Sequence, residues 1–443
     1  MAPARRRNGL TRRDVLTSSA AAFAFTIVPR HVLGDDPATA PSNRLNIACI
    51  GTGGMGGSHV REAATQNLVA LCDVDQRHIP GKKFPQARTF QDYRRMFDAM
   101  AKSIDAVYVA TPDHHHAFAS MAAIQLGKHV YCQKPLTHSV YEARRVAEAA
   151  RAAKVATQMG NQGMSSEDTR VLCELIWSGA IGHVREVHIW TDRPVNWWPQ
   201  GVPRPSDAPP VPANLDWDMW IGPAPMRPYN PAYHPFKWRG WWDFGTGALG
   251  DIALHAIPPV AWALKLERPV AIEAECSGHN GDSFPAWSII RYEYPRRGDP
   301  QRGELPPVKL VWYDGGKKPP RPEQLDKSRG ELPGNGRILI GDKGKIYGTR
   351  LIPESRMKEL KPPPKTLPRV SSHYEDWFTA CKGGRPACSN FDFIGPIAEG
   401  VMAGNIALRL GRRIEWDGQA MKAKSCPEAD AMVKREYRKG WAL

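Results

Sequence analysis

An acid and an imidazole stand four residues apart in an otherwise apolar stretch of the chain. They are Asp251 and His255, in the segment 247–255, which reads GALGDIALH. Residues four apart share one face of a helix. A histidine can accept a hydroxyl proton near neutral pH, as the oxidation of an alcohol requires. We therefore predict His255 as a general base, with Asp251 binding a neighbouring hydroxyl or tuning the imidazole. Alternatively, the pair only stabilises a helix.

The second candidate for chemistry is a glycine-rich motif, GTGGMG, at residues 51–56. The apolar run 44–50 before it is typical of a buried strand, and residues 57–65 are typical of a helix. Glycines at such a junction let the backbone approach a pyrophosphate, which the helix N-terminus then faces. We predict that a dinucleotide binds at Gly51, Gly53, Gly54, Met55 and Gly56.

An acidic residue ends the next predicted strand. The apolar run 67–72 stops at Asp73. A carboxylate about twenty residues beyond the glycine motif is placed to bind the ribose diol of a dinucleotide. The same carboxylate repels a 2′-phosphate, so Asp73 favours NAD over NADP as the cofactor.

Two more apolar runs, 104–110 and 128–132, end at polar residues. In an open parallel sheet, ligands bind outside the carboxyl ends of the strands. The glycine motif, Asp73, Thr111 and Lys134 all follow such ends, so we expect them at one edge of the sheet. The predicted cofactor-binding set is completed by Thr111, Pro112, His116, Gln133, Lys134 and Asn161.

Three consecutive histidines, residues 114–116, invite a metal interpretation. Adjacent side chains point in different directions and rarely converge on one ion. The sequence therefore predicts no metal site.

The size and charge of the chain narrow the classes of protein. Its 443 residues exceed one typical core and favour two domains. The net charge of +15 comes from scattered residues without a dense basic helix, so we predict no nucleic-acid partner. None of the eight cysteines forms a CxxC motif, and whether Cys381 and Cys388 pair stays open.

The N-terminus reads as an export signal. Arg12 and Arg13 precede the apolar run 18–28, which is too short to span a bilayer. This order resembles a twin-arginine (Tat) signal, although a disordered basic tail is the alternative. We predict a signal peptide at 1–34, a linker at 35–43, and a periplasmic or extracellular location. The Tat route carries folded proteins, so a cofactor must be bound before export. No later run approaches eighteen apolar residues, so we predict no membrane span.

Three motifs together resemble those of the Gfo/Idh/MocA oxidoreductases: GTGGMG, ATPDHHH, and AIQLGKHVYCQKPLTHSVYEARRV. The resemblance covers residues 44–443. It implies an α/β fold with an N-terminal Rossmann NAD-binding domain at 44–160. A C-terminal α+β domain follows at 161–443, with a large open, mostly antiparallel sheet that commonly pairs subunits into a dimer or tetramer.

The resemblance also assigns roles. It places Lys134 near the nicotinamide and substrate, where it would hold a substrate hydroxyl or help to move its proton. The family's usual E-K-P reads Q-K-P here, so Gln133 can still bond ribose hydroxyls but carries no negative charge. The spacing of Asp251 and His255 is similar to the family's D-x-x-x-H. With Lys134, these two residues are our predicted catalytic set.

The second half of the chain is predicted to form strands and long loops. Apolar or alternating runs occur at 184–191, 270–277, 287–294, 308–313 and 337–340. The proline-rich stretches 194–235 and 295–335 are typical of long loops. Eight of the fifteen tryptophans lie between 190 and 242. Aromatic faces pack against sugar rings, although these tryptophans could instead fill a core or an interface. We predict that a sugar contacts Arg193, Trp198, Arg239 and Trp242.

These features favour an NAD(H)-dependent oxidoreductase acting on a carbohydrate or polyol hydroxyl. Outside the cytoplasm, where free NAD is scarce, the cofactor must stay bound and be restored within the cycle. The restoring step can reduce a second carbonyl. Alternatively, transient oxidation to a keto-sugar can lead to cleavage of a glycosidic bond, although the Tyr near the His of the family's glycosidases is absent. A non-catalytic sugar-binding protein is the alternative of another class.

Overall fold

A six-stranded parallel sheet forms the first half of the chain. The computed structural model describes residues 43–278 and 280–443, so the predicted signal at 1–34 and nearly all of the linker lie outside the described residues. The strand order is β3-β2-β1-β4-β5-β6. The strands are β1 (Asn46–Ile50), β2 (Asn67–Cys72), β3 (Arg88–Phe90), β4 (Ala106–Val109), β5 (His129–Gln133) and β6 (Thr157–Gly160). This is the order of the Rossmann dinucleotide-binding fold, as predicted.

Four helices connect these strands: α3 (Gly56–Ala63), α4 (Tyr93–Met100), α5 (Asp113–Gln125) and α6 (Val140–Ala153). Their starts carry local signals. The Asp92 side chain accepts a hydrogen bond from the Arg94 amide at the start of α4, and Ser139 accepts one from the Glu142 amide at the start of α6. Such caps satisfy amides that have no partner within the helix. The apolar α5 is buried almost throughout, which fixes its first turn beneath the strand ends.

A nine-stranded sheet dominates the second half, in the order β15-β14-β13-β7-β12-β9-β8-β16-β17. Its strands are β7 (Val184–Trp190), β8 (Ala271–Cys276), β9 (Ser288–Tyr294), β12 (Val308–Tyr313), β13 (Gly336–Gly341), β14 (Gly344–Tyr347), β15 (Arg350–Ile352), β16 (Ile414–Asp417) and β17 (Lys422–Lys424). Only β7 and β12 pair in parallel, so the predicted mostly antiparallel sheet is confirmed. The five predicted runs became strands, whereas the short β14 to β17 were not predicted.

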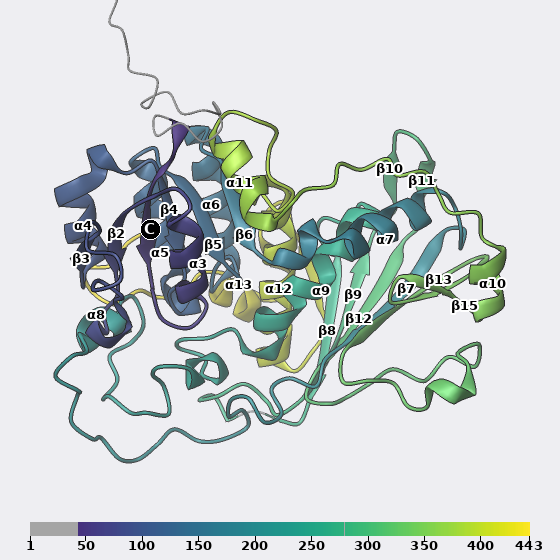
Figure 1. Ribbon diagram of the computed structural model, residues 1–443. Helices are drawn as coiled ribbons and strands as arrows, with labels where there is room; N and C mark the ends of the chain where they lie inside the picture. The colour runs from purple at the N-terminus through teal and green to yellow at the C-terminus, as the bar shows by residue number, and fades with distance from the viewer. Residues whose placement is uncertain (1–42, 279) are drawn as a thin grey trace, which may run out of the picture. The chain divides into compact units, whose positions relative to one another are not determined.

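Three helices cover one face of this sheet: α7 (Glu167–Trp177), α9 (Gly247–Leu264) and α12 (Phe391–Leu410) (Figure 1). Among the described residues, α9 is the one helix that is long and apolar enough to cross a membrane, and 78% of it is buried inside the protein. It carries the predicted Asp251 and His255.

The opposite face of the sheet is partly covered by the chain itself. Trp190, Val311 and Ile338 point to this side and pack with Leu325 and Leu332 from the loop after β12. The proline-rich stretch 295–335 is therefore only partly loop, because it also contains β12 and the hairpin of β10 (Arg297–Asp299) and β11 (Gly303–Leu305). The predicted pairing of subunits through an open sheet stays a prediction.

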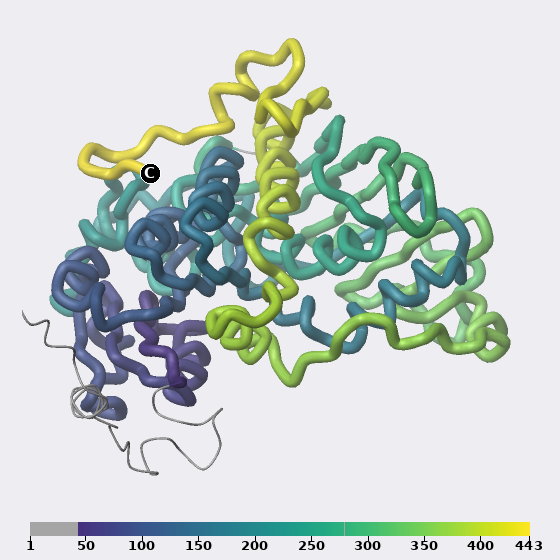
Figure 2. The backbone as a smooth tube through the Cα atoms, turned by 90° about the horizontal axis from the view of Figure 1, so that it is seen from above, coloured from purple at the N-terminus to yellow at the C-terminus, as the bar shows by residue number. Residues whose placement is uncertain are grey.

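The C-terminal part of the chain returns to the first sheet. In α11 (His373–Cys381), Trp377 and Phe378 are buried against Ile47 and Tyr108 of the parallel sheet. Beyond α13 (Pro427–Val433), the tail crosses over the first half of the molecule (Figure 2). The short α10 (Glu354–Glu359) lies beside β15. The boundary predicted after residue 160 thus separates the two sheets. It does not separate two independent cores, because α11 packs on the parallel sheet of the first half.

Candidate functional site

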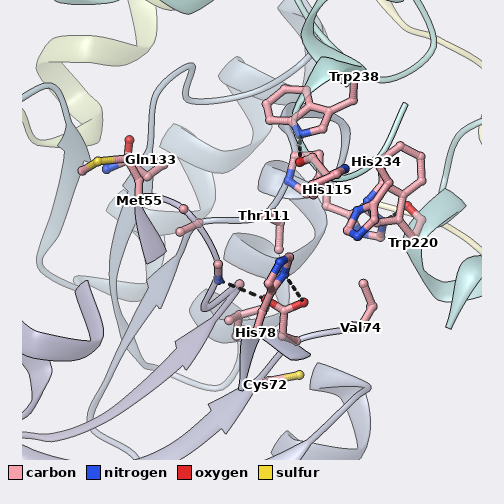
Figure 3. A pocket seen from close by; sticks show the side chains of 18 of the residues that line it. Met55, Cys72, Val74, His78, Thr111, His115, Gln133, Trp220, His234 and Trp238 are labelled. Atoms are coloured by element: carbon pink, nitrogen blue, oxygen red, sulfur yellow. Dashed lines mark hydrogen bonds and ion pairs between the residues drawn. The ribbon is translucent and has the colours of Figure 1, made fainter. Parts of the chain in front are cut away.

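A cavity of about 340 Å³ opens at the carboxyl ends of β1, β2, β4 and β5 (Figure 3). The edge of the sheet is where the sequence placed the ligand site. Ten predicted residues line this cavity: Gly51, Gly53, Gly54, Met55, Asp73, Thr111, Pro112, Gln133, Lys134 and Arg239.

The glycine motif has the geometry of a phosphate cradle. A Cβ on Gly51 would lie 2.5 Å from the Ala110 carbonyl oxygen, and one on Gly56 would lie 2.1 Å from the Gly51 carbonyl oxygen. These two positions therefore require glycine for the tight turn. Gly54, with φ of +52°, has no atom within 4 Å of its Cβ position and leaves the loop open on that side. The loop and the start of α3 therefore fit a dinucleotide pyrophosphate.

Asp73 is held at the end of β2 by the glycine loop itself. Its Oδ2 accepts hydrogen bonds from the backbone amides of Thr52 at 2.7 Å and Gly53 at 3.3 Å. Its Oδ1 accepts one from the Asp75 amide at 3.0 Å and lies 3.8 Å from His78 Nδ1. A carboxylate fixed this way is positioned for a ribose diol.

Two cations converge on one oxygen of Asp251. Lys134 Nζ lies 2.7 Å, and Arg239 Nε 3.0 Å, from Asp251 Oδ1. Burial raises the pKa of Asp251, but the charges of Lys134 and Arg239 outweigh it and lower the pKa to about 2. The cluster joins the residue after β5, the 3₁₀ turn Lys237–Gly240 and α9, three segments far apart in the sequence. It lies at the edge of the cavity, which Lys134 and Arg239 both line.

His255 lies one turn along α9 from Asp251. Burial and the positive charge of Lys134 lower its pKa to about 4, against the opposing effect of Asp251. The imidazole is therefore neutral at neutral pH and able to accept a proton. Asn161, a predicted cofactor-binding residue, instead donates from Nδ2 to the Leu254 carbonyl at 3.0 Å and so braces the backbone before His255.

Asp113 belongs to this cluster, although we did not predict a role for it from the sequence. It is the first residue of α5 and is 1% exposed. Thr246 Oγ1 donates to Asp113 Oδ2 at 2.7 Å, and Oδ1 has no partner among the described residues. Burial and the charge of Asp251 raise its pKa to about 7. The signal in the sequence was an acid at the start of the helix that follows β4, next to the three histidines.

Several predicted residues do not line the cavity. His116 is buried, with a ring nitrogen 2.8 Å from the Thr111 carbonyl oxygen. Trp198 and Trp242 are also buried, and the Trp242 ring packs on Phe284 at 3.6 Å. Arg193 lies outside the cavity, with its guanidinium 3.9 Å from the centre of the exposed Trp197 ring. Gly56 does not line the cavity, but it packs against Gly51 and so allows the tight turn of the glycine loop.

The other two histidines of the triplet hold a loop. Ring nitrogens of His114 and His115 lie 2.9 and 3.0 Å from the Trp220 carbonyl oxygen. Burial lowers the pKa of both, so they are neutral. Within the described ranges, no three His, Cys, Asp or Glu side chains gather as metal ligands, and all eight cysteines, Cys381 and Cys388 included, are free.

A segment of the second half roofs the cavity, and Arg239 is the one residue of its cavity wall that we predicted from the sequence. We call residues 212–240 the roof segment; it contains α8 (Trp217–Ile221). It contributes Met219, Trp220, His234, Pro235, Phe236, Trp238 and Arg239 to the cavity wall (Figure 3). Figure 1 shows α8 beside α4 and β3, at the far side of the first sheet. The cavity is therefore built from both halves of the chain.

Comparison with known proteins agrees with this geometry. Residues 45–161 match the family described as "Oxidoreductase family, NAD-binding Rossmann fold", and residues 166–298 match "Oxidoreductase family, C-terminal alpha/beta domain". Inositol 2-dehydrogenase of Rubrobacter xylanophilus is 32% identical over 148 residues, which are 32% of this chain and 42% of that protein. A glycosyl hydrolase family 109 protein of Stenotrophomonas maltophilia is 31% identical over 140 residues, 28% of this chain and 29% of that one. The chain thus matches less than half the length of either relative.

The fold also matches solved structures. Aldose-aldose oxidoreductase from Caulobacter crescentus, complexed with glycerol, superimposes with a TM-score of 0.55 at 18% identity, over 84% of this chain and 99% of that one. The two matched domains and the cradle described above identify the cavity as an NAD site.

Proposed function

Because the chain belongs to the Gfo/Idh/MocA family of NAD-binding oxidoreductases, we propose that it oxidises a secondary hydroxyl of a carbohydrate or polyol with a retained, recycled cofactor. The observation that carries this proposal is the convergence of Lys134, Arg239 and Asp251 at the edge of the NAD cavity, one helical turn from His255. Inositol 2-dehydrogenase, which is similar to about a third of this chain, acts on a polyol by its name.

The residues divide the reaction between them. When bound, NAD⁺ supplies the acceptor for the hydride of the carbinol C–H bond. The hydroxyl proton goes to the neutral ring of His255, so that the C–O bond becomes a carbonyl. Lys134 has three N–H donors and spends one on Asp251, which leaves donors for the substrate oxygen as charge develops on it. Asp251 holds Lys134 and Arg239 in place.

Retention of the cofactor is supported by the attachment of the roof segment. Next to Asp73, where the ribose would lie, Asp75 pairs with His234 at 3.0 Å and with Asn214 Nδ2 at 2.6 Å. The Asp216 amide also donates to the Val74 carbonyl at 2.9 Å. Because Asp75 and His234 are both buried, release of a bound dinucleotide past this side requires the segment to detach.

The C-terminal tail fastens the same segment from outside. Arg438 donates to the carbonyl oxygens of Gly222 at 2.8 Å and Asp218 at 2.9 Å, both in the roof segment. The Trp441 ring packs on His115 and Phe118 of α5, with ring centres 5.4 and 5.5 Å apart. The last residues of the chain thus tie the roof segment to the Rossmann half.

Residues 1–34 enter the proposal as a twin-arginine signal, on the sequence alone. Export in the folded state would carry the enclosed cofactor along, and a cofactor that must be restored in place fits a compartment without free NAD.

Cleavage of a glycosidic bond is the second candidate, since the similarity to a glycosyl hydrolase family 109 protein favours it. Both candidates begin with the same hydride and proton transfers. They differ in whether the sugar leaves oxidised or as two unoxidised fragments.

The test uses the full chain purified with its bound cofactor. We expect NAD to co-purify, and one member of a panel of sugars and glycosides either to reduce it or to be cleaved without net reduction. His255→Asn should abolish turnover and keep sugar binding. Absence of cofactor, with no response when NAD is supplied, would refute the enzyme and leave a sugar-binding protein.

A further inference from the structure

Two aromatic rings lie exposed beside the catalytic cluster. Trp197 is 50% exposed and Phe236 is 39% exposed, although both are large and apolar. Their ring centres are 6.4 Å apart and the rings are tilted by 39°. Exposed apolar surface next to a reactive site commonly marks a binding surface. We call this pair the aromatic platform.

The platform is continuous with the reacting cluster. The Arg239 guanidinium lies 4.4 Å from the centre of the Phe236 ring, while its Nε bonds Asp251. Phe236 itself lines the NAD cavity. A substrate whose hydroxyl meets Lys134 and His255 therefore has Phe236, and then Trp197, next along the surface.

Charged donors border the rings. Arg193 stacks on Trp197 at 3.9 Å and pairs with Asp192, and Arg239 stands on the other side at Phe236. Apolar ring faces with guanidinium and carboxylate groups at their edges match the alternating C–H and O–H surface of a pyranose. An apolar peptide would offer no hydroxyls to the remaining N–H donors of Arg193 and Arg239.

The platform is also held rigidly. Gln200 Oε1 accepts from Trp198 Nε1 at 2.9 Å and from the Ala248 amide at 3.1 Å, which ties the turn that carries Trp197 to the start of α9. A Cβ on Gly240 would lie 1.9 Å from the Pro199 carbonyl oxygen, so this turn also packs directly on the segment that carries Phe236. A preformed surface costs little ordering on binding.

Resting on the proposed function, we propose that Trp197 and Phe236 form a subsite for a second sugar ring. The substrate is then a glycoside or oligosaccharide, whose reacting ring lies at Lys134 and His255 while the linked ring lies on the platform. A free monosaccharide or an inositol fills only the first position.

The test compares sugars that differ by one ring: glucose with cellobiose and maltose, galactose with lactose, and xylose with xylobiose. Turnover is read as cofactor reduction or release of free sugar. For the series that reacts, we expect kcat/KM to be about tenfold or more higher for the disaccharide. Trp197→Ala should erase this preference through KM and leave the monosaccharide within about twofold, because Trp197 does not line the NAD cavity. Met226→Ala, 52% exposed in the same segment but outside the platform, is the control.

Equal kcat/KM for both members of the reacting series, or a preference that survives Trp197→Ala, would overturn the subsite while the proposed function stands. If no sugar reacts, the proposed function fails instead. Calorimetric titration of the wild type and Trp197→Ala with the disaccharides then tests the subsite by binding alone. Disaccharide binding that Trp197→Ala removes supports it, and no disaccharide binding to the wild type overturns it. Self-association lost in Trp197→Ala would instead assign the platform to a second copy of the chain.

Discussion

The Thr246 hydroxyl donates to Asp113 Oδ2 across 133 residues of sequence, at 2.7 Å. This bond joins the first turn of α5, beneath the NAD cavity, to the residue that precedes α9, which carries Asp251 and His255. Thr246 fits there because a Cβ on Gly250 would lie 2.1 Å from its Oγ1. The bond thus fixes the substrate side of the site against the cofactor side.

Asp113 makes the stability of the protein depend on pH. Its pKa rises from 3.8 in the unfolded chain to about 7 in the fold, because burial and the charge of Asp251 outweigh the hydrogen bond from Thr246 and the charges of Arg239 and Lys134. A group with a raised folded pKa stabilises the fold most below its unfolded pKa, and that stability is lost as pH rises toward 7. Asp113→Asn should therefore raise Tm at pH 8 by about 3 °C or more relative to its effect at pH 4. The contrary result is an equal effect at both pH values.

His255 sets the acid limb of activity. With a pKa of about 4, its ring is deprotonated throughout the neutral range, so log kcat/KM should be flat from pH 6 to 8 and fall below about pH 4. Because the charge of Lys134 lowers this pKa, Lys134→Met should raise it in an NMR titration of the His255 ring. If kcat/KM instead falls near pH 6.5, or if the His255 pKa does not change in Lys134→Met, then His255 is not the base with a pKa lowered by Lys134.

Asp251 is expected to be essential for turnover. Asp251→Asn leaves Lys134 and Arg239 without the carboxylate that holds both, so kcat/KM should fall about 100-fold or more. The matched control is Asp342→Asn, which removes a surface carboxylate paired with Arg185 and should change kcat/KM less than about twofold. Similar losses in the two variants would show that Asp251 has no special part in the reaction.

Arg438 should govern how long the cofactor stays bound. Arg438→Ala removes hydrogen bonds to Gly222 and Asp218, so the dissociation rate of bound NAD should rise about tenfold. Arg350→Ala, which removes an exposed ion pair with Glu354, is the control and should leave the rate unchanged. Release measured by dilution into a NAD-trapping enzyme checks both variants. An unchanged rate in Arg438→Ala would separate the tail from cofactor retention.

The parallel sheet and its ligand edge were predictable because they rest on local signals. Apolar runs that stop at Asp73, Thr111 and Lys134 define strand ends, and a parallel sheet brings such ends together. The nine-stranded sheet was predictable in part. Its long strands have clear alternation, whereas β14 to β17 have only three or four residues, too few for a period.

The parts that the sequence did not reveal depend on distant partners. Trp197 and Trp198 are neighbours with the same side chain, yet one is half exposed and the other buried, because only the second faces Gln200 and the start of α9. Asp113 acquires its role from Thr246 and Asp251. The roof segment has little regular structure, so no periodicity indicated where its bonds to Asp75 would place it.

The roof segment has a kinetic consequence under the proposed function. If the enzyme cannot exchange its nicotinamide between turnovers, the bound cofactor stays reduced after a donor has been oxidised. Each enzyme molecule then holds the electron pair taken from its last substrate. The oxidised form can act only on a donor and the reduced form only on an acceptor, so the two must visit the same pocket in alternation. Double-reciprocal plots at several acceptor concentrations would then be parallel lines, and the population of enzyme would behave as a two-state store of reducing equivalents.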